Sequence, residues 1–66
     1  MNNKIRVARA EVRMTQQQLA EAVDVSRQTI NAIESGKFVP STVLALKIAR
    51  TFGKSVEDIF SLEEND

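Results

Sequence analysis

A cluster of polar side chains between positions 27 and 35 could hydrogen-bond to the edges of DNA bases. At 100° per residue, a helix over residues 27–35 would bury Ile30 and Ile33 on one side. Its outward side would carry Arg27, Gln28, Asn31 and Ala32. Arg, Gln and Asn can each pair with two atoms of a base edge, and a small Ala leaves room for a thymine methyl. A helix face exposed only to solvent would more often carry Glu and Lys four residues apart, although a plain solvated face is the alternative.

These side chains are expected to lie on a helix, because apolar residues recur at helical spacing along the whole chain. Thr15 with Gln18 three residues later predicts a capping box, Ser26 and Ser41 are good N-caps, and Gly36 suits the left-handed position after a helix. These start and stop signals predict an all-α, compact five-helix bundle with helices at 4–13, 16–23, 27–35, 42–52 and 56–61. The short connection between the second and third helices forces a large crossing angle, which is the helix-turn-helix arrangement.

The composition limits what else the chain can do. Sixty-six residues form one domain, 1–66, without His or Cys and without a glycine-rich phosphate loop. An enzyme is therefore not expected, nor is a cofactor, a metal or a small-molecule ligand. No apolar run is long enough to span a bilayer and no signal peptide is evident, so we expect no membrane partner and a cytoplasmic protein of a prokaryote or phage.

The net charge is zero, but the charges are unevenly distributed. All nine basic residues precede position 55 and share that stretch with four acids, which leaves +5 there. The last twelve residues hold five acids and no base. A basic body with an acidic tail is compatible with a protein that meets phosphate on one face, although ordinary surface charge could also sort in this way.

The pattern of fixed residues resembles a known family. The matching positions read Thr15-Gln16-x-x-Leu19-Ala20-x-x-x-x-Val25-Ser26-x-x-x-Ile30-x-x-Ile33-Glu34-x-Gly36-Lys37-x-x-Pro40-Ser41. This pattern is similar to the Cro/CI-type helix-turn-helix of the Xre family of transcription regulators, and the resemblance runs from about Arg9 to Phe60. Among small members, the chain is especially similar to the cytolysin-repressor type. The resemblance implies a lambda-repressor-like DNA-binding fold and a double-stranded DNA operator as partner.

The resemblance also implies roles for individual residues. The base-reading residues would be Arg27, Gln28, Asn31 and Ala32, in the major groove. The phosphate contacts would come from Gln16, Thr29, Ser35 and Lys37, with a thymine methyl as the alternative for Thr29. Arg9 and Glu34 match a pair that forms a partly buried structural ion pair in the family. The set Leu19, Ala20, Val25, Ile30 and Ile33 would be core.

The C-terminal segment 55–66 is expected to serve as dimerisation segment and tail. Its apolar residues are Val56, Ile59, Phe60 and Leu62, which we expect at the interface of a homodimer that binds a near-palindromic operator. The alternative is that all four close the core of one chain. Residues after Leu62 are expected to fray, and Phe38 is expected to plug the core.

The expected function is a homodimeric repressor that acts by occluding a promoter. Two alternatives use the same fold: an antitoxin of a toxin–antitoxin pair and a restriction–modification controller protein.

Overall fold

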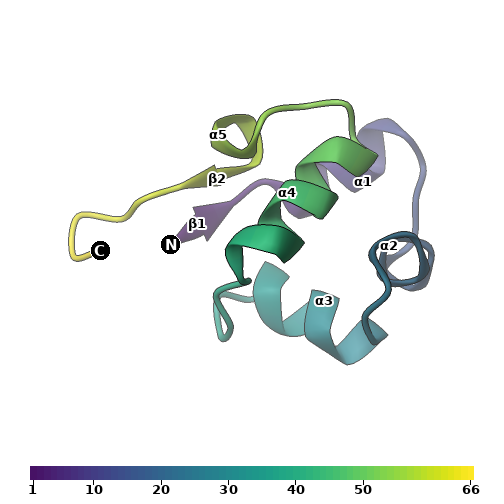
Figure 1. Ribbon diagram of the computed structural model, residues 1–66, viewed down its shortest axis with the longest axis horizontal. Helices are drawn as coiled ribbons and strands as arrows, with labels where there is room; N and C mark the ends of the chain where they lie inside the picture. The colour runs from purple at the N-terminus through teal and green to yellow at the C-terminus, as the bar shows by residue number, and fades with distance from the viewer.

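The computed structural model describes residues 1–66, and it is a bundle of five helices closed by a two-stranded sheet (Figure 1). The helices are α1 (Ile5–Glu11), α2 (Gln16–Val23), α3 (Arg27–Glu34), α4 (Thr42–Thr51) and α5 (Val56–Ile59). The strands are β1 (Asn2–Asn3) and β2 (Phe60–Ser61). The expected five-helix bundle is confirmed, and none of its helices is both long and apolar enough to cross a membrane.

Hydroxyl side chains start four of the five helices. Thr15, Ser26, Ser41 and Ser55 each accept a hydrogen bond from the backbone N–H of the third helical residue. The predicted capping box is present, because Gln18 Oε1 in turn accepts from the backbone N–H of Thr15 at 2.9 Å. Since such caps satisfy N–H groups that have no partner inside the helix, they define the helix starts from local sequence alone.

The helix ends follow from backbone conformation as well as from sequence. Gly36 has φ +80°, as expected for the residue after α3, and Gly53 has φ +64° after α4. Asp24 adopts the left-handed conformation at the end of α2, at φ 63°. Arg13 also has positive φ, so α1 ends at Glu11, two residues before the expected end. A non-glycine residue in this region is uncommon, which is why the sequence did not indicate it.

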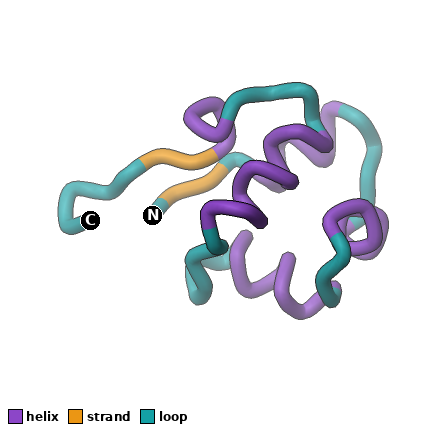
Figure 2. The backbone as a smooth tube through the Cα atoms, viewed as in Figure 1, coloured by secondary structure: helices purple, strands orange, loops and turns teal.

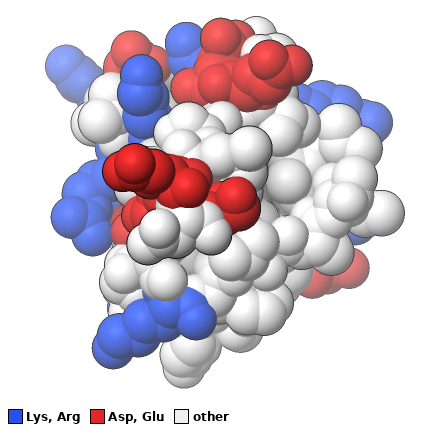
Figure 3. Space-filling model, turned by 90° about the vertical axis from the view of Figure 1, so that its left-hand side faces the viewer, with Lys and Arg blue, Asp and Glu red and all other residues white.

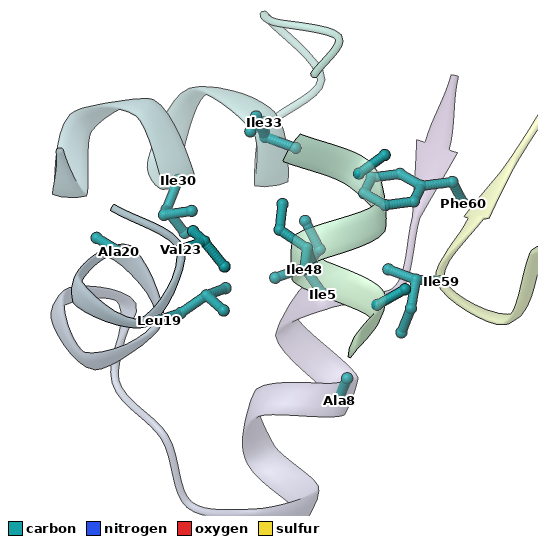
Figure 4. Packing of buried hydrophobic residues seen from close by; sticks show 12 residues of the cluster. Ile5, Ala8, Leu19, Ala20, Val23, Ile30, Ile33, Ile48, Ile59 and Phe60 are labelled. Atoms are coloured by element: carbon teal, nitrogen blue, oxygen red, sulfur yellow. The ribbon is translucent and has the colours of Figure 1, made fainter. Parts of the chain in front are cut away.

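The core is a single cluster to which every helix contributes (Figure 4). Its members are Ile5, Ala8, Leu19, Ala20, Val23, Ile30, Ile33, Ala45, Ile48, Ala49, Ile59 and Phe60. Of the five residues expected in the core around the turn, four are fully buried and Val25 is half-buried against the cluster. Because α2 and α3 both insert their apolar faces here, the core fixes the orientation of α3.

The sheet and the tail differ from expectation. Phe60 and Ser61 were expected to continue the last helix, but they form β2, which pairs antiparallel with β1 at Asn3↔Phe60 and Asn2↔Ser61 (Figure 2). The residues after Leu62 form a turn, in which the Glu63 N–H donates to Asp66 Oδ2 at 2.8 Å. The terminal amine of Met1 lies 3.0 Å from Asp66 Oδ2, so both ends of the chain meet there. Strands of two residues are too short to show an alternating pattern, so their pairing depends on tertiary structure.

Phe38 was expected to plug the core, and this expectation is wrong. Phe38 is 49% exposed. The backbone N–H groups of Lys37 and Phe38 both donate to the Ala32 carbonyl, which holds the start of the loop against the end of α3. Pro40, two residues further on, is the loop residue that is buried.

Candidate DNA-binding surface

Helices α2 and α3 form a helix-turn-helix whose second helix has one face open to solvent. Figure 1 shows α2 nearly end-on, whereas α3 runs across the view, so the two helices cross at a large angle. The turn between them spans Asp24–Ser26, and the Val25 N–H donates to the Ala20 carbonyl at 3.0 Å. Ile30 and Ile33 anchor the inner face of α3 in the core. The outer face is therefore held rigidly by packing on the other side.

The residues expected to read bases share this outer face. Arg27, Gln28 and Asn31 are exposed, and Ala32 is half-buried one turn after Gln28. Arg27 forms no ion pair and Gln28 no side-chain hydrogen bond within the chain. The donors of Arg27 and the amide of Gln28 are therefore free for a ligand.

The residues expected to contact phosphate are arranged less uniformly. Lys37 is exposed after α3. The Ser35 hydroxyl donates to the Ala32 carbonyl at 3.1 Å, and the Thr29 hydroxyl lies 2.9 Å from that of Ser26. Gln16 begins α2, but its side-chain amide donates to Asn31 Oδ1 at 3.2 Å and to Glu34 Oε1 at 3.1 Å. Of this set, Lys37 alone has a side chain whose donors are all available.

The ion pair implied by the resemblance is present between α1 and α3. Arg9 Nε donates to Glu34 Oε2 at 2.7 Å and Nη2 donates to Oε1 at 3.1 Å, while Nη1 donates to the Met14 carbonyl. The Glu34 side chain is only 1% exposed, and Arg6 Nε lies 3.5 Å from its Oε1. Burial raises the pKa of Glu34, but the hydrogen bonds from Arg9 and Gln16 outweigh it and hold that pKa below its ordinary value. The only acid of α3 is thus ionised, paired and withdrawn from the outer face.

Asn3 supports α3 in a way that the sequence did not indicate. Its Nδ2 donates to the Ile33 carbonyl at 2.9 Å, and its Oδ1 accepts from the Ile5 N–H at 3.3 Å. One side chain therefore satisfies a carbonyl near the end of α3 and an N–H at the start of α1. The Asn2-Asn3 pair before an apolar helix was the available signal, since Asn favours such local capping positions.

The four apolar residues expected at the dimer interface differ in how far they are exposed. Ile59 and Phe60 are buried in the chain's own core, so they cannot supply the main contact area of an interface, and that part of the expectation is corrected. Val56 is half-buried, and Leu62 is 76% exposed.

Exposed apolar residues that the sequence analysis did not single out lie beside Val56. Val43 and Leu46 of α4 are exposed, as is Val39 in the preceding loop. Val43, Leu46 and Val56 line one shallow groove between α4 and α5. Val43 and Leu46 lie three residues apart and are offset from the buried positions 45, 48 and 49, and this offset was the signal in the sequence.

Comparison with known proteins agrees with this geometry. A helix-turn-helix family profile matches residues 5–59. The chain is 48% identical over 66 residues to the transcriptional regulator YgzD of Bacillus subtilis and 52% identical over 66 residues to a helix-turn-helix-type transcriptional regulator of Methanocaldococcus jannaschii, with 100% of each chain covered in both cases. The chain therefore belongs to the helix-turn-helix family of transcription regulators.

A solved structure supports the same assignment. The clp gene regulator ClgR from Corynebacterium glutamicum matches with a TM-score of 0.77 and 33% sequence identity. The match covers 82% of this chain and 57% of the ClgR chain, so the present chain spans little more than half the length of that regulator.

Proposed function

We propose that this protein binds double-stranded DNA sequence-specifically by inserting α3 into the major groove. The observation that carries the proposal is the outer face of α3, where Arg27, Gln28 and Asn31 are exposed together without an acid among them. Side chains of these types discriminate base pairs in the major groove, where each pair presents a distinct pattern of donors and acceptors. A phosphate-lined groove would repel an exposed carboxylate, and the one on α3 is buried against Arg9.

Phosphate contacts would flank the reading face and set its register. The first backbone N–H groups of α2, at Gln16 and Gln17, have no partner inside the helix and can donate to a phosphate. Lys37 offers a charged group on the other side of α3. Ser35 can exchange its hydrogen bond to the Ala32 carbonyl for one to phosphate. The Thr29 hydroxyl is already hydrogen-bonded to the Ser26 hydroxyl, which leaves it less available to a phosphate. Such contacts supply affinity and salt dependence but little sequence preference.

We further propose that the protein acts as a homodimer. The longest dimension of one chain is 31 Å, whereas successive half-sites on one side of the duplex lie about 34 Å apart. One recognition helix thus reads one half-site, and a two-fold pair of chains would read a near-palindrome. Leu62 and Val56 remain from the expected segment, and the exposed α4 residues Val43 and Leu46 extend the apolar surface beside Val56. The end of the molecule that carries both termini shows a broad uncharged area beside its acidic groups (Figure 3).

The regulatory outcome we propose is repression, because a dimer seated across a promoter excludes polymerase without any further domain. Activation is the second candidate. The transcriptional activator BcrR of Enterococcus faecalis is 36% identical over 63 residues, although the match covers only 31% of that protein.

A binding selection on random duplex DNA tests the proposed function. The protein should enrich a two-fold symmetric sequence, and affinity for it should fall steeply between about 50 and 200 mM salt. The matched control is Arg27→Ala with Gln28→Ala, which should leave the fold intact because both residues are exposed and their side chains form no hydrogen bond or ion pair within the chain. Enrichment of no sequence by the native chain would contradict DNA reading. A promoter-fused reporter then separates repression from activation by the sign of its response.

A further inference from the structure

We propose that Arg6, in the first turn of α1, contacts a DNA phosphate, so that α1 binds DNA together with α2 and α3. The inference rests on the proposed function, since it adds a residue to the same DNA-binding surface. The sequence alone does not distinguish Arg6 among the nine basic residues of the chain. The structure distinguishes it by its position beside Glu34.

Two side-chain contacts place Arg6 next to the start of α2. Arg6 Nε lies 3.5 Å from Glu34 Oε1. The same oxygen accepts a hydrogen bond from Gln16 Nε2 at 3.1 Å, and Gln16 is the first residue of α2. The side chains of Arg6 and Gln16 therefore meet at one carboxylate oxygen in the last turn of α3. The guanidinium of Arg6 thus lies at the border of the proposed DNA-binding surface.

Glu34 has little need of Arg6. Arg9 already holds the Glu34 carboxylate through two hydrogen bonds, at 2.7 and 3.1 Å, and Gln16 supplies a third. Arg6 makes no hydrogen bond to it, and the Arg6 side chain is 73% exposed. Because an ion pair that is so exposed contributes little to stability, stabilisation of the fold does not account for an arginine at this position.

The positive charge of Arg6 has no acid of its own. No acidic residue lies three or four positions from Arg6 along the chain, where a helical neighbour could pair with it. Glu34 carries one negative charge and faces two guanidinium groups, so one positive charge remains. Arg9 is only 15% exposed, and the remaining charge is therefore presented to solvent by Arg6. A guanidinium with free N–H donors matches the oxygens of a phosphate.

The position of Arg6 indicates which phosphate it would contact. In the proposed complex, a phosphate accepts from the first backbone N–H groups of α2, and Lys37 contacts the backbone on the other side of α3. Arg6 lies on the α2 side, because it meets the Gln16 side chain at Glu34. It would therefore contact the phosphate at the start of α2 or the next one on the same strand.

A double-mutant cycle between protein and DNA tests the contact, with the full chain and the duplex that it selects. Each phosphate of one half-site is replaced in turn by a methylphosphonate, which carries no charge. At the phosphate that Arg6 contacts, the replacement should weaken native binding by roughly two- to fivefold. There it should cost the Arg6→Gln variant nothing, because the interacting charge is already absent. The slope of log K against log salt should also fall by about 1 per bound chain in Arg6→Gln.

Lys4→Gln is the matched control, because it removes the same charge from a nearby position. Lys4 is exposed and lines the hollow between α1 and α5, away from Glu34. This variant should keep the full effect of the methylphosphonate and nearly the native salt slope. Arg6→Lys retains the charge and should restore the slope that Arg6→Gln loses. Thermal unfolding of Arg6→Gln should be close to that of the native chain, which separates a lost DNA contact from a loss of folded protein.

Each outcome decides a separate claim. An Arg6→Gln variant with the native salt slope overturns the inference, and so does one that loses affinity without coupling to any phosphate. In both cases DNA binding by the native chain still stands. Equal effects of Arg6→Gln and Lys4→Gln also overturn it, because net charge alone would then explain them. If the native chain selects no duplex, the proposed function fails and the inference fails with it.

Discussion

The Arg9 guanidinium holds the Glu34 carboxylate through two hydrogen bonds, from Nε at 2.7 Å and from Nη2 at 3.1 Å. This pair joins α1 to the last turn of α3. Glu34 is almost completely buried and also accepts from Gln16, so the pair lies between the core and the candidate reading face. Changes to this pair should therefore affect the stability of the folded chain and the position of the candidate reading face.

Removal of one member of the pair should be costly. Arg9→Met leaves the buried Glu34 charge with only Arg6 and Gln16, and we expect the free energy of unfolding to fall by about 3 kcal/mol. Urea denaturation monitored by circular dichroism measures this loss. Arg6→Met is the control, because Arg6 is 73% exposed and its pair contributes little. Replacing both Arg9 and Glu34 by Met should cost less than the sum of the two single changes, and strict additivity would contradict the coupling.

The same carboxylate should make stability depend on acid pH. The pKa of Glu34 is lowered in the folded chain, because hydrogen bonds from Arg9 and Gln16 outweigh the opposing effect of burial. Its stabilising contribution is therefore complete above the ordinary pKa and is lost as the pH falls through the lowered folded value. Urea midpoints measured from pH 7 down to about pH 3 should fall more for the native chain than for Glu34→Gln. Parallel pH profiles of the two proteins would show that Glu34 is not responsible.

Asn3 should matter more for stability than its neighbour. Asn3→Ala removes the hydrogen bonds to the Ile33 carbonyl and from the Ile5 N–H, and we expect a loss of about 1–2 kcal/mol. Asn2→Ala is the matched control, since Asn2 is exposed and pairs only through its backbone. Thermal unfolding of the two variants gives the comparison, and equal losses would argue against the bridging role of Asn3.

Base-reading and phosphate-contacting residues should respond differently to mutation. Arg27→Ala and Gln28→Ala should each reduce discrimination at one base pair by about 1–3 kcal/mol. Lys37→Ala should weaken binding to all sequences alike and reduce the slope of log K against log salt by about 1. Titrations of cognate and scrambled duplexes at several salt concentrations distinguish the two effects. A Lys37 variant that lost selectivity alone would reverse the assignment.

The dimer should depend on exposed apolar residues and not on buried ones. Leu46→Glu combined with Leu62→Glu places charges on the proposed interface, while both side chains are exposed in one chain and their loss leaves the core intact. We expect this variant to sediment as a monomer and to bind DNA more weakly than the native dimer. Val7→Glu is the control, because Val7 of α1 is also exposed and does not line the α4–α5 groove. Native protein that sediments as a monomer at micromolar concentration would rule out the dimer.

Local signals in the sequence were sufficient for the helices and for the face that α3 presents. Thr15, Ser26 and Ser41 act as N-caps within three residues of their partners, and Ile30 and Ile33 mark the buried side by spacing alone. These features depend on neighbours along the chain, so they could be predicted before any fold was known. The exposed positions of Arg27, Gln28 and Asn31 follow from the same periodicity.

Other features required the tertiary structure, because their partners are distant in sequence. The pairing of Asn3 with Phe60 turned an expected helical end into a strand and placed Phe60 in the core, which corrected its assignment to a dimer interface. Phe38 is exposed because the loop start is tied to Ala32 and Pro40 is buried in its place. Residue types alone indicated that Gln16 and Asn31 could bind DNA. The direction in which their amides point depends on Glu34, and Glu34 acquires its fixed position only when folding brings Arg9, 25 residues away, within hydrogen-bonding distance.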